Sequence, residues 1–131
     1  MGTRDRKGTV TDFFRLIGEG KPKEGLKYCA PDCIQHNPYV TGGMEALFDS
    51  MLDAMTNMRQ QFPNPELKVN RILVDGDFVA AYTQLLSYRG EPSKGGLRQV
   101  HLFRFKGDKI AEYWDVTQPI GPDMTNAGGA F

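Results

Sequence analysis

The first half of the chain spaces its apolar residues as α-helices do. Val10, Phe13, Phe14 and Ile17 share one helical face, with Thr9 or Thr11 as the cap at its start and Gly18 and Gly20 at its end. A short second helix is expected after Pro22, because the first turn of a helix tolerates proline.

The clearest helix is expected from about Gly43 to Arg59, before Pro63 and Pro65. One apolar stripe runs along it, and the stripe consists of Met44, Leu47, Phe48, Met51, Leu52, Met55 and Met58. Methionine adapts to irregular gaps. Met51 and Met55 therefore have two interpretations: filling of the core, or a pliable wall of a pocket for an apolar ligand.

In the second half of the chain, the apolar residues have the two-residue period of β-strands. Strands are expected over 67–74, 78–88, 97–105 and 109–118, and Asp75-Gly76 is typical of a tight turn. A short extended segment over 33–38 precedes the long helix. Helices followed by a meander predict an α+β domain, in which N-terminal helices pack on a curved, mostly antiparallel sheet. We expect a single domain over 1–131, with its core at about 8–118 and an irregular tail over 119–131.

The last two strands carry apolar residues on both faces. Val100 and Leu102 oppose Phe103 and Phe105 on one strand, and Ile110, Trp114 and Val116 oppose Ala111 and Tyr113 on the other. A sheet that is apolar on both faces needs cover on both. The long helix covers one face, and we predict that a second copy of the chain covers the other, which gives a homodimer packed sheet to sheet.

Composition and charge narrow the class of protein. The chain has 16 basic and 16 acidic residues and no net charge, which argues against nucleic acid as a partner. No run of residues is apolar enough to cross a membrane, and the polar start at 1–7 lacks the apolar region of a secretory signal, so a cytoplasmic protein is expected. Cys29 and Cys33 are then expected as reduced thiols. With His36 they suggest a metal site, but a zinc site needs further ligands, and we expect neither metal nor cofactor.

Candidate chemistry is concentrated on two neighbouring strands. Alternation puts Gln99, His101 and Phe103 on one face of the third strand, and Tyr113 and Asp115 on one face of the fourth. If the turn between them is a three-residue loop, 106–108, Gln99 pairs with Asp115 and His101 with Tyr113. A two-residue loop would shift the register by one residue and separate them.

This arrangement suits proton abstraction next to a carbonyl group. We expect Phe103, Tyr113 and Trp114 to surround Asp115 and to contact the ligand, and among these rings Asp115 would lose hydration, which increases its basicity. His101 and Gln99 beside it would donate hydrogen bonds to the enolate oxygen. The alternative is that His101 and Asp115 form a buried structural contact with no catalytic role. His36-Asn37-Pro38 is likewise open to two interpretations: a simple turn, or a turn that points His36 or Asn37 into the pocket mouth.

Several motifs together resemble one family. They are Ile34-Gln35-His36-Asn37-Pro38, Gly43-x-x-Ala46, Asp75-Gly76-Asp77-Phe78-Val79, Phe103-Arg104, and the run from Gly107 to Val116 with Glu112-Tyr113-Trp114-Asp115. In this order, over about 8–120, they resemble the SnoaL-like polyketide cyclases of the nuclear transport factor 2-like superfamily.

The resemblance implies a cone-shaped α+β barrel that is a homodimer and closes a hydrophobic polyketide by intramolecular aldol condensation without a cofactor. It also implies Asp115 as the acid and base, His101 and Gln99 as its neighbours, and Asn37 as a polar contact. Many relatives have His where this chain has Tyr113, which leaves the substrate open. Related epoxide hydrolases carry Arg-x-Asp where Gln99 and His101 stand, so epoxide opening is disfavoured. An isomerase, a dehydratase and a non-catalytic binding module remain as alternatives.

Overall fold

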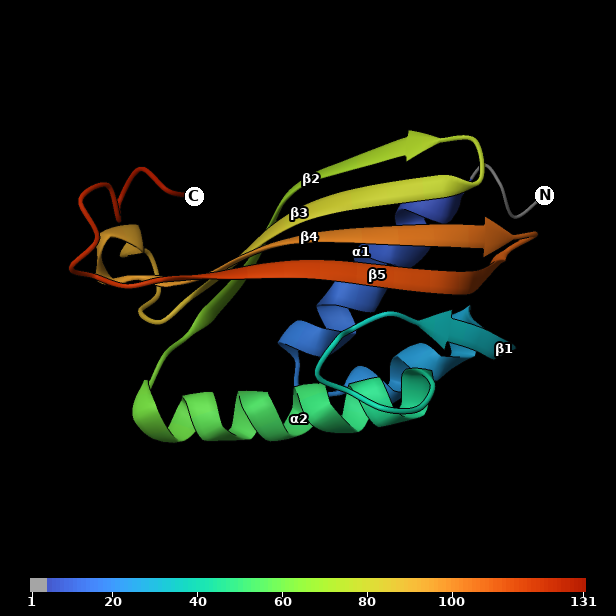
Figure 1. The fold of residues 1–131 in the computed structure, drawn as a ribbon, viewed down its shortest axis with the longest axis horizontal. Helices are drawn as coiled ribbons and strands as arrows, with labels where there is room; N and C mark the ends of the chain where they lie inside the picture. The colour runs from blue at the N-terminus through green and yellow to red at the C-terminus, as the bar shows by residue number, and fades with distance from the viewer. Residues whose placement is uncertain (1–4) are drawn as a thin grey trace.

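Two helical segments and one strand come first along the chain, and a long helix and an antiparallel meander of strands follow (Figure 1). The computed structural model describes residues 5–131. The helical segments are α1 (Arg6–Gly18), the 3₁₀ segment η2 (Pro22–Tyr28), α2 (Met44–Gln61) and the 3₁₀ turn η3 (Pro92–Lys94). The strands are β1 (Cys29–Gln35), β2 (Glu66–Asp75), β3 (Phe78–Leu86), β4 (Gly96–Lys106) and β5 (Lys109–Ile120).

The sheet is curved and open. Its strand order is β1-β5-β4-β3-β2, with every neighbouring pair antiparallel except β1 and β5. In Figure 1, α1 lies behind the strands and α2 runs below them, so the sheet curves over both helices without closing into a complete barrel. The predicted α+β architecture, with helices on a curved and mostly antiparallel sheet, is confirmed.

Aromatic rings from both helices and the sheet form the centre of the core. The Phe13 ring of α1 lies 5.2 Å from Phe103 on β4 and 5.5 Å from Phe48 on α2, measured between ring centroids. Phe103 in turn lies 5.1 Å from Tyr113 on β5. Phe48, Phe103 and Tyr113 have no exposed surface. This cluster joins α1, α2 and the sheet. Phe103 is enclosed in it and cannot contact a ligand.

The helix α1 starts earlier than its apolar pattern predicts. It begins at Arg6, so the predicted caps Thr9 and Thr11 lie inside it, and the Thr11 hydroxyl donates to the Lys7 carbonyl instead. The buried Arg6 side chain explains the extension, because its guanidinium donates to the carbonyls of Gly76 and Gly107 at 2.9 Å. One side chain thus anchors the helix start to two hairpin turns, a long-range contact that local periodicity does not contain.

The turn between β4 and β5 also differs from the prediction. It is the two-residue Gly107-Asp108 turn, with Lys106 paired to Lys109, rather than a three-residue loop. Gly107 has a φ of +63°, which suits a tight hairpin turn. A bulge follows at once, because Phe105 pairs with Ile110 but Arg104 pairs with Glu112.

The bulge restores the face alignment that the short turn would have lost. The turn shifts the register by one residue, and Ala111, which has no partner, shifts it by one more. As a result His101 pairs with Asp115 and Gln99 with Thr117, instead of the predicted pairs, yet all four side chains share the inner face. The same shift turns Ile110 into the core, where it is fully buried, contrary to the predicted outward orientation.

Only the first half of the apolar stripe on α2 is packed into the core. Met44, Leu47 and Phe48 are buried, whereas Met51, Met55 and Met58 are half-buried and Leu52 is exposed. The second half of α2 therefore stands away from the sheet, and a cavity lies between them.

The tail begins later than predicted, since β5 continues to Ile120. The remaining residues form turns that come back to the sheet, where Arg98 donates to the Ala130 carbonyl at 2.7 Å and Ala127 is buried. Cys29 and Cys33 are free thiols. Within residues 5–131, no helix combines the length and the apolar character that crossing a membrane requires.

The outer face of the sheet carries two rows of apolar residues across the strands. Val116 is 70% exposed and pairs with Val100, which is 49% exposed. The next row crosses four strands, and it consists of Leu73, Ala80, Leu102 and Trp114. Neither α1 nor α2 covers this face.

Candidate functional site

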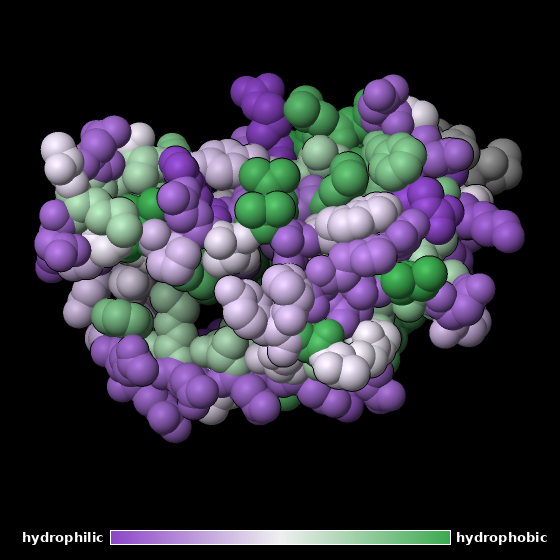
Figure 2. Space-filling view, viewed as in Figure 1, coloured by the Kyte–Doolittle hydropathy of each residue, from purple (hydrophilic) through white to green (hydrophobic). Residues whose placement is uncertain are grey.

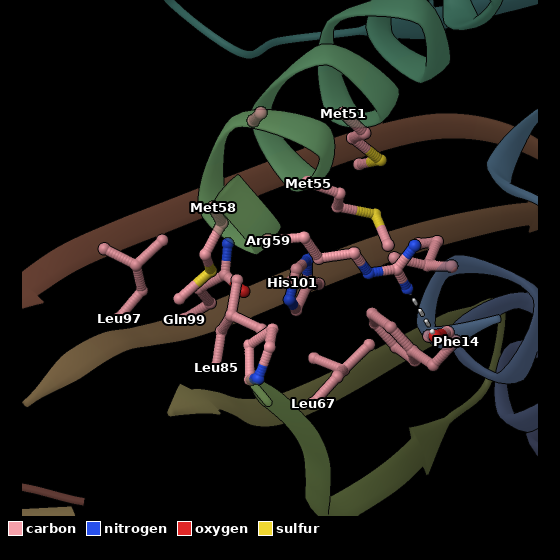
Figure 3. A pocket seen from close by; sticks show the side chains of 14 residues that line it. Phe14, Met51, Met55, Met58, Arg59, Leu67, Leu85, Leu97, Gln99 and His101 are labelled. Carbon is pink, nitrogen blue, oxygen red and sulfur yellow. Dashed lines mark hydrogen bonds between the residues drawn. The ribbon is translucent and has the colours of Figure 1, made fainter. Parts of the chain in front are cut away.

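A cavity of about 160 Å³ lies between the second half of α2, the end of α1 and the inner face of the sheet (Figure 3). Its wall is mostly apolar, and the polar side chains on it are Arg59, Gln99 and His101. Three methionines of α2 form its roof. The lining residues are Phe14, Ile17, Gly18, Met51, Ala54, Met55, Met58, Arg59, Pro65, Leu67, Leu85, Leu97, Gln99 and His101.

A wider outer cavity of about 580 Å³ continues from the inner one. The two share five lining residues, which are Ala54, Met55, Met58, Leu85 and Leu97. Pro122 lines the outer cavity beside Ile120, the last residue of β5, so the tail helps to form its wall. Figure 2 shows a hollow between α2 and the sheet, with hydrophilic residues along the outer side of the helix. We refer to the two cavities together as the cleft.

His101 stands at the inner end of the cleft and makes a hydrogen bond with each ring nitrogen. Its Nδ1 lies 2.7 Å from the Tyr113 hydroxyl, and its Nε2 lies 2.9 Å from the Thr83 hydroxyl. The ring is only 3% exposed, and burial lowers the pKa of His101 to about 3. His101 is therefore neutral at physiological pH.

Tyr113 connects His101 to Asp115. Its hydroxyl lies 3.2 Å from Asp115 Oδ2, and burial together with the Asp115 charge raises the pKa of Tyr113 well above its ordinary value. The tyrosine therefore keeps its proton, and a carboxylate is the better acceptor for it. Because the Tyr113 hydroxyl donates its hydrogen bond to Asp115, His101 must carry its proton on Nδ1 and donate it to the tyrosine oxygen. The Nε2 atom of His101 is then unprotonated and accepts a hydrogen bond from Thr83.

Gln99 lies beside this network on the cavity wall. Its Nε2 donates to the Thr117 hydroxyl at 3.1 Å, and its Oε1 lies 3.4 Å from the Thr83 hydroxyl. An amide nitrogen carries two N–H groups, so one remains for a ligand in the cavity. Both nitrogens of His101 are engaged within the wall. Gln99 is therefore the better placed hydrogen-bond donor, whereas the sequence suggested both residues.

Asn37 holds Asp115 from the other side. Its Nδ2 donates to both carboxylate oxygens, at 3.0 and 3.1 Å, and its contact with a ligand stays a prediction. Gln35 fixes the loop that carries Asn37, because its side-chain amide donates to the carbonyls of Val40 and Gly42. Asp115 is thus oriented by a neutral amide and a neutral phenol, and it is half-buried rather than enclosed by aromatic rings.

His36 and Trp114 lie on the opposite face of the sheet, away from the cleft. Their rings stack at 4.9 Å, and His36 Nε2 lies 2.6 Å from Glu112 Oε2. Glu112 also accepts from Arg104, and these two hydrogen bonds, His36 first, lower its pKa. The expectation that His36 and Trp114 contact a ligand in the pocket is wrong, because side chains alternate along β5 and those at 113 and 115 take the inner face.

The remaining predicted residues divide into two groups. Met51, Met55, Gln99 and His101 line the inner cavity as expected. Phe103 and Tyr113 are fully buried in the core, and neither cavity of the cleft includes Phe103, Tyr113 or Asp115 in its lining.

Sequence reasoning missed three participants: Thr83, Gln35 and Arg59. The alternation of the strand over 78–86 could have predicted Thr83, because it is a polar residue at an inward-facing position. Gln35 acts through the loop that directly follows it, and Arg59 acts through Gly18, which is 41 residues away in the sequence.

The fold and the site together define a class of protein. An open, curved sheet that covers helices and forms a mostly apolar cleft with a few polar groups on its inner wall is the nuclear transport factor 2-like fold. The sequence profile of one family matches residues 8–122. The chain belongs to the SnoaL-like polyketide cyclase family.

Solved structures share this fold at low sequence identity. AclR, a proposed hydroxylase from Streptomyces galilaeus, is 19% identical with a TM-score of 0.66, over 88% of this chain and 90% of its own. IdmH, a proposed polyketide cyclase from Streptomyces antibioticus, is 17% identical with a TM-score of 0.64, over 86% and 91%. A proposed ketosteroid isomerase from Kribbella flavida is 18% identical with a TM-score of 0.62, over 88% and 79%. Comparison with curated protein sequences found no match. Three different chemistries on one fold mean that function must be argued from the site.

Proposed function

We propose that this chain is a cofactor-independent enzyme that acts on a small hydrophobic carbonyl compound, as a polyketide cyclase does, by proton abstraction at Asp115. The observation that supports this is the placement of two polar groups on the inner face of the sheet: Asp115, linked through Tyr113 to His101, and Gln99 on the cleft wall. The same face thus carries a carboxylate, which can take a proton, and an amide that can stabilise an enolate.

The reaction needs no group beyond these side chains. Asp115 takes a proton from the carbon next to the carbonyl group, and the electron pair of the broken C–H bond moves into the enolate. The free N–H of Gln99 donates to the enolate oxygen. The enolate carbon then forms a C–C bond with a second carbonyl of the same molecule, and Asp115 returns the proton to the resulting alkoxide. Tyr113 and His101 position Asp115, and they remain neutral throughout.

A non-catalytic binding module is the second candidate, and one observation favours it. Neither cavity of the cleft includes Asp115 in its lining, so a ligand confined to the inner cavity would contact His101 and Gln99 without reaching the carboxylate. Under this alternative the polar network only stabilises the inner wall.

We also propose that the chain forms a homodimer through the outer face of the sheet. The two uncovered apolar rows on that face, one through Val100 and Val116 and one through Leu102 and Trp114, support this arrangement. The inner face is already used by α1 and by the cleft.

Deuterium exchange distinguishes the two functions without knowledge of the natural substrate. Aromatic polyketide esters and ketosteroids are first screened for binding by thermal shift, and each hit is incubated with the protein in D₂O. A catalytic base incorporates deuterium at the carbon next to the carbonyl group, which NMR detects. Asp115→Asn should keep the fold and the ligand and slow exchange by about 10²- to 10⁴-fold. Exchange that is equally fast in Asp115→Asn would refute the base, and binding without exchange in the wild type would establish the binding module.

A further inference from the structure

The inner cavity carries one charged side chain, and its surroundings suggest which ligands the cleft accepts. Arg59 lies in the last turn of α2, and in Figure 3 its side chain crosses the cavity between Met55 and Leu67. The outer cavity likewise has a cation, Lys94, in its lining. Neither lining contains an aspartate or a glutamate, although the whole chain has as many acidic as basic residues.

Arg59 is an exposed residue, and within residues 5–131 its guanidinium has few protein partners. Its one hydrogen bond goes to the Gly18 carbonyl, at 3.5 Å, and no carboxylate of residues 5–131 lies within salt-bridge distance. A guanidinium has five N–H donors. Lys94 differs in this respect, because it pairs with Glu91 at 3.4 Å and lies over the Tyr88 ring.

Two glycines leave space for the guanidinium at the cavity edge. Gly18 lines the cavity itself, and a Cβ at Gly20 would lie 3.1 Å from Arg59 Nη1. Gly20 also has a φ of +79°, a conformation that other residues adopt only with strain. The end of α1 thus provides a backbone surface on which the guanidinium rests, while its remaining donors are available to the cavity.

We propose that Arg59 forms an anion-binding subsite in the cleft, and that the ligand is an apolar molecule that carries a carboxylate at one end. In such a complex the apolar body lies between the methionines of α2 and the sheet. The carboxylate accepts a two-pronged hydrogen bond from Arg59, and the polar wall at Gln99 and His101 meets the opposite part of the ligand. This inference deepens the proposed function, since it assigns a substrate class to the same cleft, but its test uses binding and does not require catalysis.

The test compares an acid with its own ester. Binding of 2-naphthoate and methyl 2-naphthoate is measured by isothermal titration calorimetry at pH 7, where the acid is ionised. The proteins are the wild type, Arg59→Met and Arg59→Lys. Arg71→Met serves as the matched control, because Arg71 is an exposed arginine outside both cavities. Thermal melts of all variants report whether Arg59 also stabilises the end of α1.

We expect the wild type and Arg71→Met to bind the acid at least about 10-fold more tightly than the ester, as a charge-assisted hydrogen bond would give. Arg59→Met should lose this preference and Arg59→Lys should keep part of it. Equal binding of acid and ester by the wild type, or an unchanged preference in Arg59→Met, would overturn the subsite and leave the proposed function intact. Failure of the wild type to bind either ligand would also overturn the subsite, whereas the proposed function is decided by the deuterium-exchange test.

Discussion

The neutrality of His101 can be tested through the pH dependence of stability. His101 is buried beside Tyr113 and Thr83, and this burial lowers its pKa to about 3. An unfolded histidine has a pKa of about 6.5. Between these two pKa values His101 is protonated in the unfolded chain but not in the folded protein. The free energy of unfolding therefore falls as the pH falls. The contribution of His101 is fully present above about pH 6.5 and lost progressively toward about pH 3.

The size of the effect follows from the two pKa values. Proton linkage between a folded pKa of about 3 and an unfolded pKa of about 6.5 costs about 2 kcal/mol on going from pH 7 to pH 5. The variant His101→Gln keeps a polar side chain in the network but cannot titrate. The lowered carboxyl pKa of Glu112 also destabilises the fold in acid, but that contribution is common to both proteins and cancels in the comparison.

Urea unfolding at pH 7 and pH 5 measures the difference directly. The wild type should lose about 2 kcal/mol more than His101→Gln between these two conditions. His36→Gln is the matched control, since His36 is the other histidine of the chain and lies on the opposite face of the sheet. We expect His36→Gln to keep the wild-type loss that His101 causes. If His101→Gln and the wild type lose equal stability, His101 is not held neutral, and the proton assignment of the network is wrong.

Two further predictions test the network and the outer face. Tyr113→Phe removes the hydroxyl between His101 and Asp115, so a buried N–H loses its acceptor; urea unfolding should show a loss of about 1–3 kcal/mol, and an unchanged midpoint would mean that the link contributes nothing. Val116→Lys places a charge on the exposed outer face, so light scattering after size exclusion should show a dimer for the wild type and a monomer for the variant; a monomeric wild type would refute the sheet-to-sheet dimer.

The residues that line the cleft differ from the predicted ones because packing between segments distant in the sequence decides where the cavity lies. The stripe on α2 runs without interruption from Met44 to Met58, so the sequence offers no sign of where packing stops and the cavity begins. Packing stops because Phe13 and Phe48 fill the space near the start of α2, and no residue of α1 fills it near the end. Phe103 was expected in the pocket, but it packs against the rings of Phe13 and Tyr113.

Periodicity was enough to derive the helices α1 and α2, the strands β2 to β5, the α+β class, and the alternation that separates Asp115 from Trp114, whereas β1 was expected only as a short extended segment over 33–38. These properties are local, because each depends on which side of its own element a residue faces. The bulge at Ala111, the anchoring of α1 by Arg6 and the link from His101 through Tyr113 to Asp115 were decided by tertiary structure. The register between β4 and β5 is set by the burial of Phe105 and Ile110 together with the turn, and the free energy of that burial depends on the whole core rather than on any segment of the sequence.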